Sequence, residues 1–164
     1  MPRVLILYHS KTGNTKAMAE FVKKGVLQEG ITDVLCKTVE ETNPEELLHA
    51  EGIIIGSPAY YGGMAWQVKK FLDESIKYHK KLQGKVGGAF TSSGLTGGGN
   101  ETTIQDILHA LLIHGMVIQG TASGDHYGPV SIAAPDKTVE KNCENLGRRV
   151  AVLVDRLFGI NSLT

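Results

Sequence analysis

The sequence predicts an α/β fold: a three-layer sandwich in which a five-stranded parallel sheet has helices on both faces. Short runs of β-branched and aliphatic residues alternate with segments whose apolar residues recur at helical spacing, a pattern typical of repeated strand–helix units. Several runs are apolar at every position, as in strands covered on both sides. Loops rich in glycine and hydroxyl residues follow the runs, where such sheets bind ligands. A chain of 164 residues suits one domain, residues 1–164.

The predicted strands differ in how apolar they are, which indicates their places in the sheet. The first is a uniform aliphatic block, the second is more mixed and so nearer an edge, and the third is the most β-branched and so central. The predicted strands are residues 3–8, 31–39, 53–55, 86–90 and 116–118.

Caps and apolar stripes predict the helices. Asn43 caps a short helix, with Pro44 in its first position. The other predicted helices start near residues 14, 65, 101 and 136. The first predicted stripe is Ala17, Met18, Phe21, Val22 and Val26. The stripe of the helix at 101–114 is Ile104, Ile107, Leu108, Leu111 and Leu112. That of the last helix is Val139, Cys143, Leu146, Val150, Leu153 and Leu157.

Composition excludes several classes of function. The 17 basic and 17 acidic residues balance and are mixed along the chain, so we expect no nucleic-acid surface. No run approaches the roughly 20 apolar residues of a membrane span, and the first residues lack a secretory leader pattern. We therefore expect a cytoplasmic protein without membrane insertion. Cys36 and Cys143 lack metal-ligand spacing, so we expect reduced thiols and no metal.

The loop between the first strand and first helix has the chemistry of a phosphate cradle. Free N–H groups and the positive end of the helix would meet a phosphate there, together with hydroxyl oxygens. The loop consists of Ser10, Lys11, Thr12, Gly13, Asn14 and Thr15. Right-handed crossovers place the loops at 57–63, 91–100 and 123–129 at the same edge of the sheet, which predicts one shared pocket.

These loops resemble those of a known superfamily. Residues 10–15 resemble the FMN-phosphate loop of flavodoxins, Thr or Ser followed by any residue and Thr-Gly-Asn-Thr. Gly56-Ser57-Pro58, the triple glycine at 97–99 and His114-Gly115 resemble the WrbA-type NAD(P)H:quinone oxidoreductases. The resemblance implies a flavodoxin-like sandwich with strand order 2-1-3-4-5 that binds FMN noncovalently.

The same resemblance implies roles for the other two glycine-bearing loops. One would line a side of the isoalloxazine ring, through Ser57, Pro58, Ala59, Tyr60, Tyr61 and Gly62. The other would approach the pyrimidine edge and ribityl oxygens, through Thr91, Ser92, Ser93, Gly94, Gly97, Gly98 and Gly99. His126 is a candidate hydrogen-bond donor or proton relay at the flavin. No residue is a compelling catalyst; His126 and Tyr60 are weak candidates.

Other residues are expected to be structural or solvated. Trp66 opens a helix and is expected to pack, and His9 is expected to be structural or solvated. The cluster Lys77, Lys80, Lys81 and Lys85 is expected to be a solvated far edge.

Two functions remain open on the sequence. The first is an FMN-dependent oxidoreductase that passes electrons from NADH or NADPH to a quinone or similar small acceptor. The alternative is a flavodoxin that carries electrons between redox proteins. The neutral charge and the loop at 91–100, which has no aromatic residue, favour the enzyme, because such carriers usually are acidic and flank the ring with aromatics from both loops. A homo-oligomer, dimer or tetramer, is compatible with either.

Overall fold

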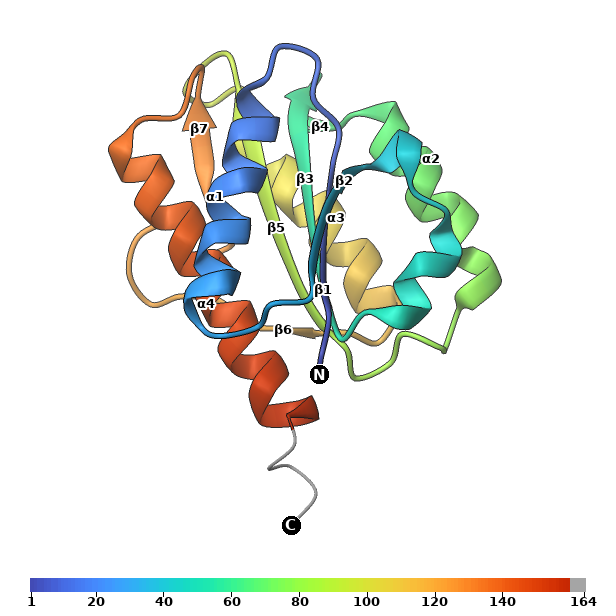
Figure 1. The fold of residues 1–164 in the computed structure, drawn as a ribbon. Coiled ribbons are helices and arrows are strands. Elements are labelled where there is room, and N and C mark those ends of the chain that lie inside the picture. The colour runs from blue at the N-terminus through green and yellow to red at the C-terminus, as the bar shows by residue number, and fades with distance from the viewer. Residues whose placement is uncertain (160–164) are drawn as a thin grey trace.

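A computed structural model of the chain describes residues 1–159. Its central parallel sheet runs in the order β2 (Val34–Thr38), β1 (Val4–Tyr8), β3 (Gly52–Tyr60), β5 (Val86–Ser93) and β6 (Val117–Ile118). Two short strands lie off this path: β4 (Gly63–Met64) pairs antiparallel with β3, and β7 (Val130–Ile132) pairs parallel with β5. The predicted fold class and strand order are confirmed (Figure 1).

Helices cover both faces of the sheet. Figure 1 shows α1 (Asn14–Gln28) and α4 (Lys137–Phe158) together on one face. The other face is covered by 3₁₀ helices η1 (Val39–Glu41), η2 (Pro44–His49) and η3 (Ser75–Tyr78), with α2 (Trp66–Glu74) and α3 (Asn100–Ile113). Asn43 caps η2 as predicted, in a full capping box with Glu46.

Each face of the sheet has its own apolar core, because side chains of a strand alternate between faces. Ile53 and Ile55 pack with α2 and α3, whereas Ile54 between them packs with α1 and α4. The three residues predicted as the central strand are fully buried. The central strand of the sheet is therefore packed on both faces.

Two strands are longer than predicted, and the fifth is split. β3 continues through Ser57 to Tyr60, and β5 continues through Thr91 to Ser93, because β3 and β5 pair in register as far as Pro58 and Ser92. The fifth position is occupied by β6 beside Val86 and Gly87 and, after residues 119–129, by β7 beside Thr91 to Ser93.

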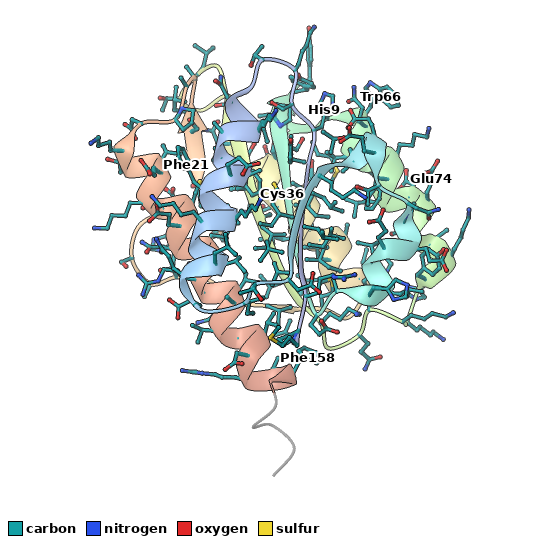
Figure 2. All side chains as sticks on the ribbon, in the orientation of Figure 1. His9, Phe21, Cys36, Trp66, Glu74 and Phe158 are labelled. Carbon is teal, nitrogen blue, oxygen red and sulfur yellow. The ribbon has the colours of Figure 1, made fainter. Side chains whose placement is uncertain are left out.

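Four side chains differ from their predicted environment. Leu112 is 54% and Leu157 45% exposed, because each lies at the margin of its helix's apolar face near the helix end. Trp66 is 67% exposed and points outward at the start of α2 (Figure 2), so the prediction that it packs was wrong. Lys85 is half-buried and donates to the carbonyls of Leu48 and Ala50, so it is not part of a solvated cluster.

Within residues 1–159, none of the helices combines the length and the apolarity that crossing a bilayer requires.

Candidate functional site

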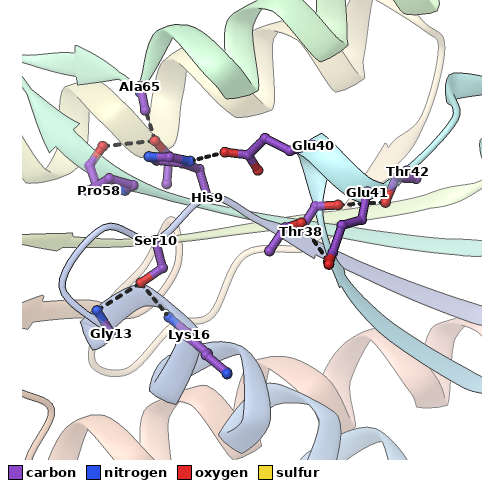
Figure 3. Close-up of polar contacts among 11 residues, drawn as sticks. His9, Ser10, Gly13, Lys16, Thr38, Glu40, Glu41, Thr42, Pro58 and Ala65 are labelled. Carbon is purple, nitrogen blue, oxygen red and sulfur yellow. Dashed lines mark hydrogen bonds and ion pairs between the residues drawn. The ribbon is translucent and has the colours of Figure 1, made fainter.

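The loop after β1 is shaped by one serine. Ser10 Oγ accepts hydrogen bonds from the N–H groups of Gly13 (3.1 Å) and Lys16 (3.3 Å), so its own hydrogen is left to donate (Figure 3). Gly13 has φ +97°, a left-handed conformation that favours glycine, and it turns the chain into α1. Within the loop, the turn is therefore shaped by its own backbone and one hydroxyl.

This loop fits an anion. The N–H groups of Asn14 and Thr15 in the first helical turn have no intrahelical acceptor, and no acidic residue lies in that turn to compete for them. Lys11 and Thr12 are exposed beside them. The donor set consists of backbone N–H groups, the Ser10 and Thr12 hydroxyls and the Lys11 ammonium, which together suit the charge and oxygen atoms of a phosphate.

Thr15, predicted to contact a phosphate, has a different partner. It is 1% exposed, and its Oγ1 lies 2.8 Å from the Oγ of Ser92 on β5. The two hydroxyls tie the start of α1 to the carboxyl end of the sheet. Thr15 thus braces the cradle in this structure, and Thr12 offers the accessible hydroxyl.

The second loop is a tight hairpin. Tyr60 pairs with Gly63, and the two residues between them, Tyr61 (φ +50°) and Gly62 (φ +83°), both have positive φ, as in a type I′ turn. Tyr61 is fully exposed and Tyr60 is 40% exposed, while Pro58 and Ala59 are half-buried in β3. The hairpin presents two aromatic side chains at the carboxyl edge of the sheet.

Ser57 and Thr91 are wholly buried and act within the protein. Ser57 Oγ accepts from the N–H of Ala65 (2.8 Å) and donates to the carbonyl of Pro58 (2.8 Å), which joins β3 to the start of α2. Thr91 Oγ1 donates to the carbonyl of Ser57 (2.7 Å). Both residues were predicted to contact a ligand directly, and here they hold the strand ends that carry the loops.

The third loop contacts the hairpin. A Cβ on Gly99 would lie 2.5 Å from the Cα of Gly62, so the two backbones are in direct contact. Thr102 Oγ1 donates to the carbonyl of Gly62 (2.6 Å), and Ser93 Oγ bonds within the loop to Leu95 and Asn100. Gly94, Gly97 and Gly98 are exposed. The hairpin and the triple glycine therefore form one continuous wall.

His126 does not lie at the carboxyl ends of the strands. Residues 119–129 leave the sheet after β6 and return before β7, so they flank the middle of β5. The expectation that residues 123–129 leave a strand at the carboxyl edge is therefore wrong. His126 is exposed and its Nδ1 donates to the carbonyl of Thr121 (2.8 Å). The split of the fifth strand explains the error.

Two residues at this edge were not predicted. The Nδ1 of His9 lies 2.5 Å from Oε1 of Glu40 on η1 (Figure 3). The ring also meets Tyr60 edge-on, with centroids 6.5 Å apart. The position of His9 directly before the phosphate-type loop could have indicated from the sequence that it belongs to the site. Glu40 lies 31 residues further along the chain and carried no signal.

The two thiols lie outside the site. Burial raises the pKa of Cys36 to about 12 and raises that of Cys143 even further. Both stay protonated near neutral pH and are poor nucleophiles. They are free in this structure, as expected.

A groove of about 840 Å³ lies between α2 and α3, away from the phosphate-type loop. Its lining combines apolar side chains such as Leu72 and Ile113 with His79, His109 and His114. Gly63 and Asp106 lie at the end next to the hairpin. Most of the groove runs along the helices and not over the strand ends.

A doubly covered parallel sheet with an anion cradle at its first strand–helix turn and two glycine-bearing loops beside it defines a mononucleotide-binding α/β protein. Comparisons with known proteins identify the family within this broad class. Residues 5–121 match the family model described as a flavodoxin domain. The chain therefore belongs to the flavodoxin family. Membership of this family makes it an FMN-binding redox protein.

Similar proteins include both flavodoxins and an oxidoreductase. The chain is 39% identical to a flavodoxin of Aquifex aeolicus, over 94% of this chain and 90% of the relative. It is 34% identical to an NAD(P)H dehydrogenase (quinone) of Archaeoglobus fulgidus, over 96% of this chain and all of the relative. The crystal structure of a flavodoxin, WrbA-like protein from Agrobacterium tumefaciens superposes with a TM-score of 0.82 at 28% identity, covering 95% of this chain and 99% of that one.

Proposed function

We propose that this protein binds FMN at the carboxyl edge of its sheet and uses it to transfer electrons from NADH or NADPH to a quinone or similar small acceptor. The observation that carries the proposal is the cradle at residues 10–15, where the free N–H groups of Asn14 and Thr15 lie beside the hydroxyls of Ser10 and Thr12. Bound FMN would supply the redox chemistry, and the chain would supply binding and orientation.

Specific residues would hold the cofactor. The phosphate would take hydrogen bonds from Ser10, Thr12 and the first N–H groups of α1, with Lys11 nearby. The ring would lie against the wall formed by the hairpin and the triple glycine, where Gly62, Gly97 and Gly98 are exposed and carry no side chain. Tyr60 and Tyr61 are the aromatic groups in reach of a ring at this edge.

The alternative is an electron carrier between redox proteins. Relatives named flavodoxin support it, among them the one from Aquifex aeolicus. The enzyme is favoured by the neutral net charge and by a third loop, residues 94–99, that contains no aromatic side chain.

Flavin binding and reduction test both functions. Apoprotein titrated with FMN should quench flavin fluorescence, and rapid mixing of the loaded protein with NADH or NADPH should bleach the flavin within seconds. Bleaching by either nucleotide supports the enzyme. FMN binding without reduction by either would favour the carrier, and a protein that does not bind FMN would contradict both.

A single variant tests where the phosphate lies. Thr12→Val removes a hydroxyl that would donate to the phosphate, so FMN affinity should fall about 10- to 100-fold, the usual worth of a hydrogen bond to a charged group. Thr32→Val, an exposed residue before β2, is the control and should leave affinity unchanged. Equal affinities of the two variants would place the phosphate elsewhere.

A further inference from the structure

The chain just before the cradle is anchored through one residue, His9. Within residues 1–159, two hydrogen bonds join residues 9–13 to segments other than α1, and His9 makes both of them. Its N–H donates to the carbonyl of Gly56 (3.3 Å), and its ring bonds to Glu40 (2.5 Å). His9 therefore ties the exit of β1 to β3 through the backbone and to η1 through the ring.

The geometry assigns a direction to the ring bond. A carboxylate only accepts hydrogen bonds, so Nδ1 of His9 carries the hydrogen and donates it to Oε1 of Glu40. The His9 side chain is 12% exposed, whereas that of Glu40 is 46% exposed. The bond is thus shielded on the histidine side, and the same ring meets Tyr60 edge-on.

We infer that His9 and Glu40 are positioning residues that hold the cradle in its phosphate-binding shape and thereby set the preference for FMN over riboflavin. Ser10 follows His9 directly, and its hydroxyl organises the N–H groups of the loop. Lys11, Thr12 and Gly13 are exposed, and within residues 1–159 the hydrogen bonds of Gly13 go to Ser10 and to α1. A loop held before the ligand arrives loses less conformational entropy on binding, which raises affinity.

The inference rests on the proposed FMN site and predicts different effects on two flavins. Glu40 reaches the cradle through its bond to His9, and no hydrogen bond or ion pair among residues 1–159 joins its side chain to the hairpin or the triple glycine. Its removal should weaken binding of the phosphate-bearing flavin and spare the flavin that has no phosphate. A general loss of folding would weaken both.

The experiment compares FMN and riboflavin on the same variants by fluorescence quenching. Glu40→Ala should raise the dissociation constant for FMN about fivefold to tenfold and change that for riboflavin less than twofold. Glu40→Gln keeps an oxygen that accepts from Nδ1 and should recover most of the FMN affinity. His9→Ala should weaken both flavins, because it also removes the contact with Tyr60.

The control is Glu41→Ala in the same 3₁₀ helix, whose carboxylate bonds to Thr38 and not to the loop. It should leave both dissociation constants unchanged. Equal FMN affinity of Glu40→Ala and wild type, or an equal loss for both flavins, would overturn the inference and leave the proposed site intact. Failure of the wild-type protein to bind FMN would overturn the proposed function and the inference together.

Discussion

Gly99 is the residue on which the contact between two loops depends. It combines φ +94° with a backbone approach to Gly62 that leaves no room for a Cβ. Gly97 in the same loop also has positive φ, but open space surrounds it. Substitution of Gly97 should therefore cost backbone strain alone, whereas substitution of Gly99 should cost strain and a steric clash.

Gly99→Ala should destabilise the protein by about 2–4 kcal/mol, because strain of about 1 kcal/mol adds to overpacking of about 1–3 kcal/mol. It should also weaken FMN binding by moving the hairpin. Gly97→Ala should cost only about 1 kcal/mol. Urea unfolding and FMN titration of both variants measure this difference, and equal costs would argue against contact between the loops.

At this scale the sequence predicted the kinds of residue at the site better than their contacts. The hydroxyls and glycines at 10–15 and 91–99 lie near the carboxyl edge, as expected. Thr15, Ser57 and Thr91 were assigned to a ligand, yet their hydroxyls bond within the protein. A short motif gives the chemistry of a hydroxyl, but its partner is 77 residues away for Thr15, and such pairing depends on the folded sheet.

Helices α1 and α4 approach each other closely through two glycines. A Cβ on Gly147 would lie 2.1 Å from the carbonyl oxygen of Val22, and one on Gly25 would lie 2.0 Å from that of Glu144. Backbone atoms cannot move aside as a flexible side chain can. The two helices would have to separate to accept any larger residue.

Gly147→Ala should therefore destabilise the protein by at least about 2 kcal/mol, although alanine in place of glycine within a helix normally stabilises it by about 1 kcal/mol. The exposed substitution Lys141→Ala in the same helix is the control and should stay within about 0.5 kcal/mol of wild type. Denaturant unfolding measures both. A stabilised Gly147→Ala variant would contradict the close packing.

His114 joins the end of α3 to η3 and makes stability depend on pH. Ser75 Oγ donates to the carbonyl of Leu72 (2.6 Å), so it accepts the Nε2–H of a neutral His114 (2.8 Å). Burial, and then the neighbouring His79, lower the pKa of His114 below 6.5. His114 therefore binds a proton more readily in the unfolded chain than in the folded protein. As a result, the stability that neutral His114 contributes is lost as pH falls below about 6.5.

The unfolding free energy should fall between pH 7.5 and 5.5, with a contribution from His114 of up to about 1.4 kcal/mol per pH unit. His114→Gln should flatten that part of the profile. His109→Gln, which changes an exposed histidine on α3, should leave the slope unchanged. Identical slopes for the two variants would show that His114 does not carry the effect.

Element positions followed from the sequence, whereas element ends did not. Apolar runs located β1, β3 and β5, because burial on both faces requires uniform apolarity. β3 and β5 continue into residues such as Pro58 and Ser92 that are typical of turns, since pairing between neighbouring strands outweighs local preference. The split into β6 and β7 was missed because two or three residues are too few to show a period.

The whole molecule should respond to its cofactor through its stability. A ligand that binds only the folded state at a hundredfold excess over its dissociation constant stabilises it by about 2.7 kcal/mol. For a chain of this size we expect FMN to raise the midpoint of thermal unfolding by about 5–10 °C. Riboflavin at the same concentration should raise it less, because it lacks the phosphate. Equal shifts would argue against binding through the cradle.

The interrupted fifth strand also affects whether copies of the molecule can associate through the edge of the sheet. The outer edge beside β5 consists of β6, two residues long, and β7, three residues long, with residues 119–129 between them. A long straight edge would offer a row of unpaired backbone groups on which another chain could form a strand. Two fragments separated by a loop are too short for that pairing. The split strand thus protects this side of the sheet against edge-to-edge aggregation.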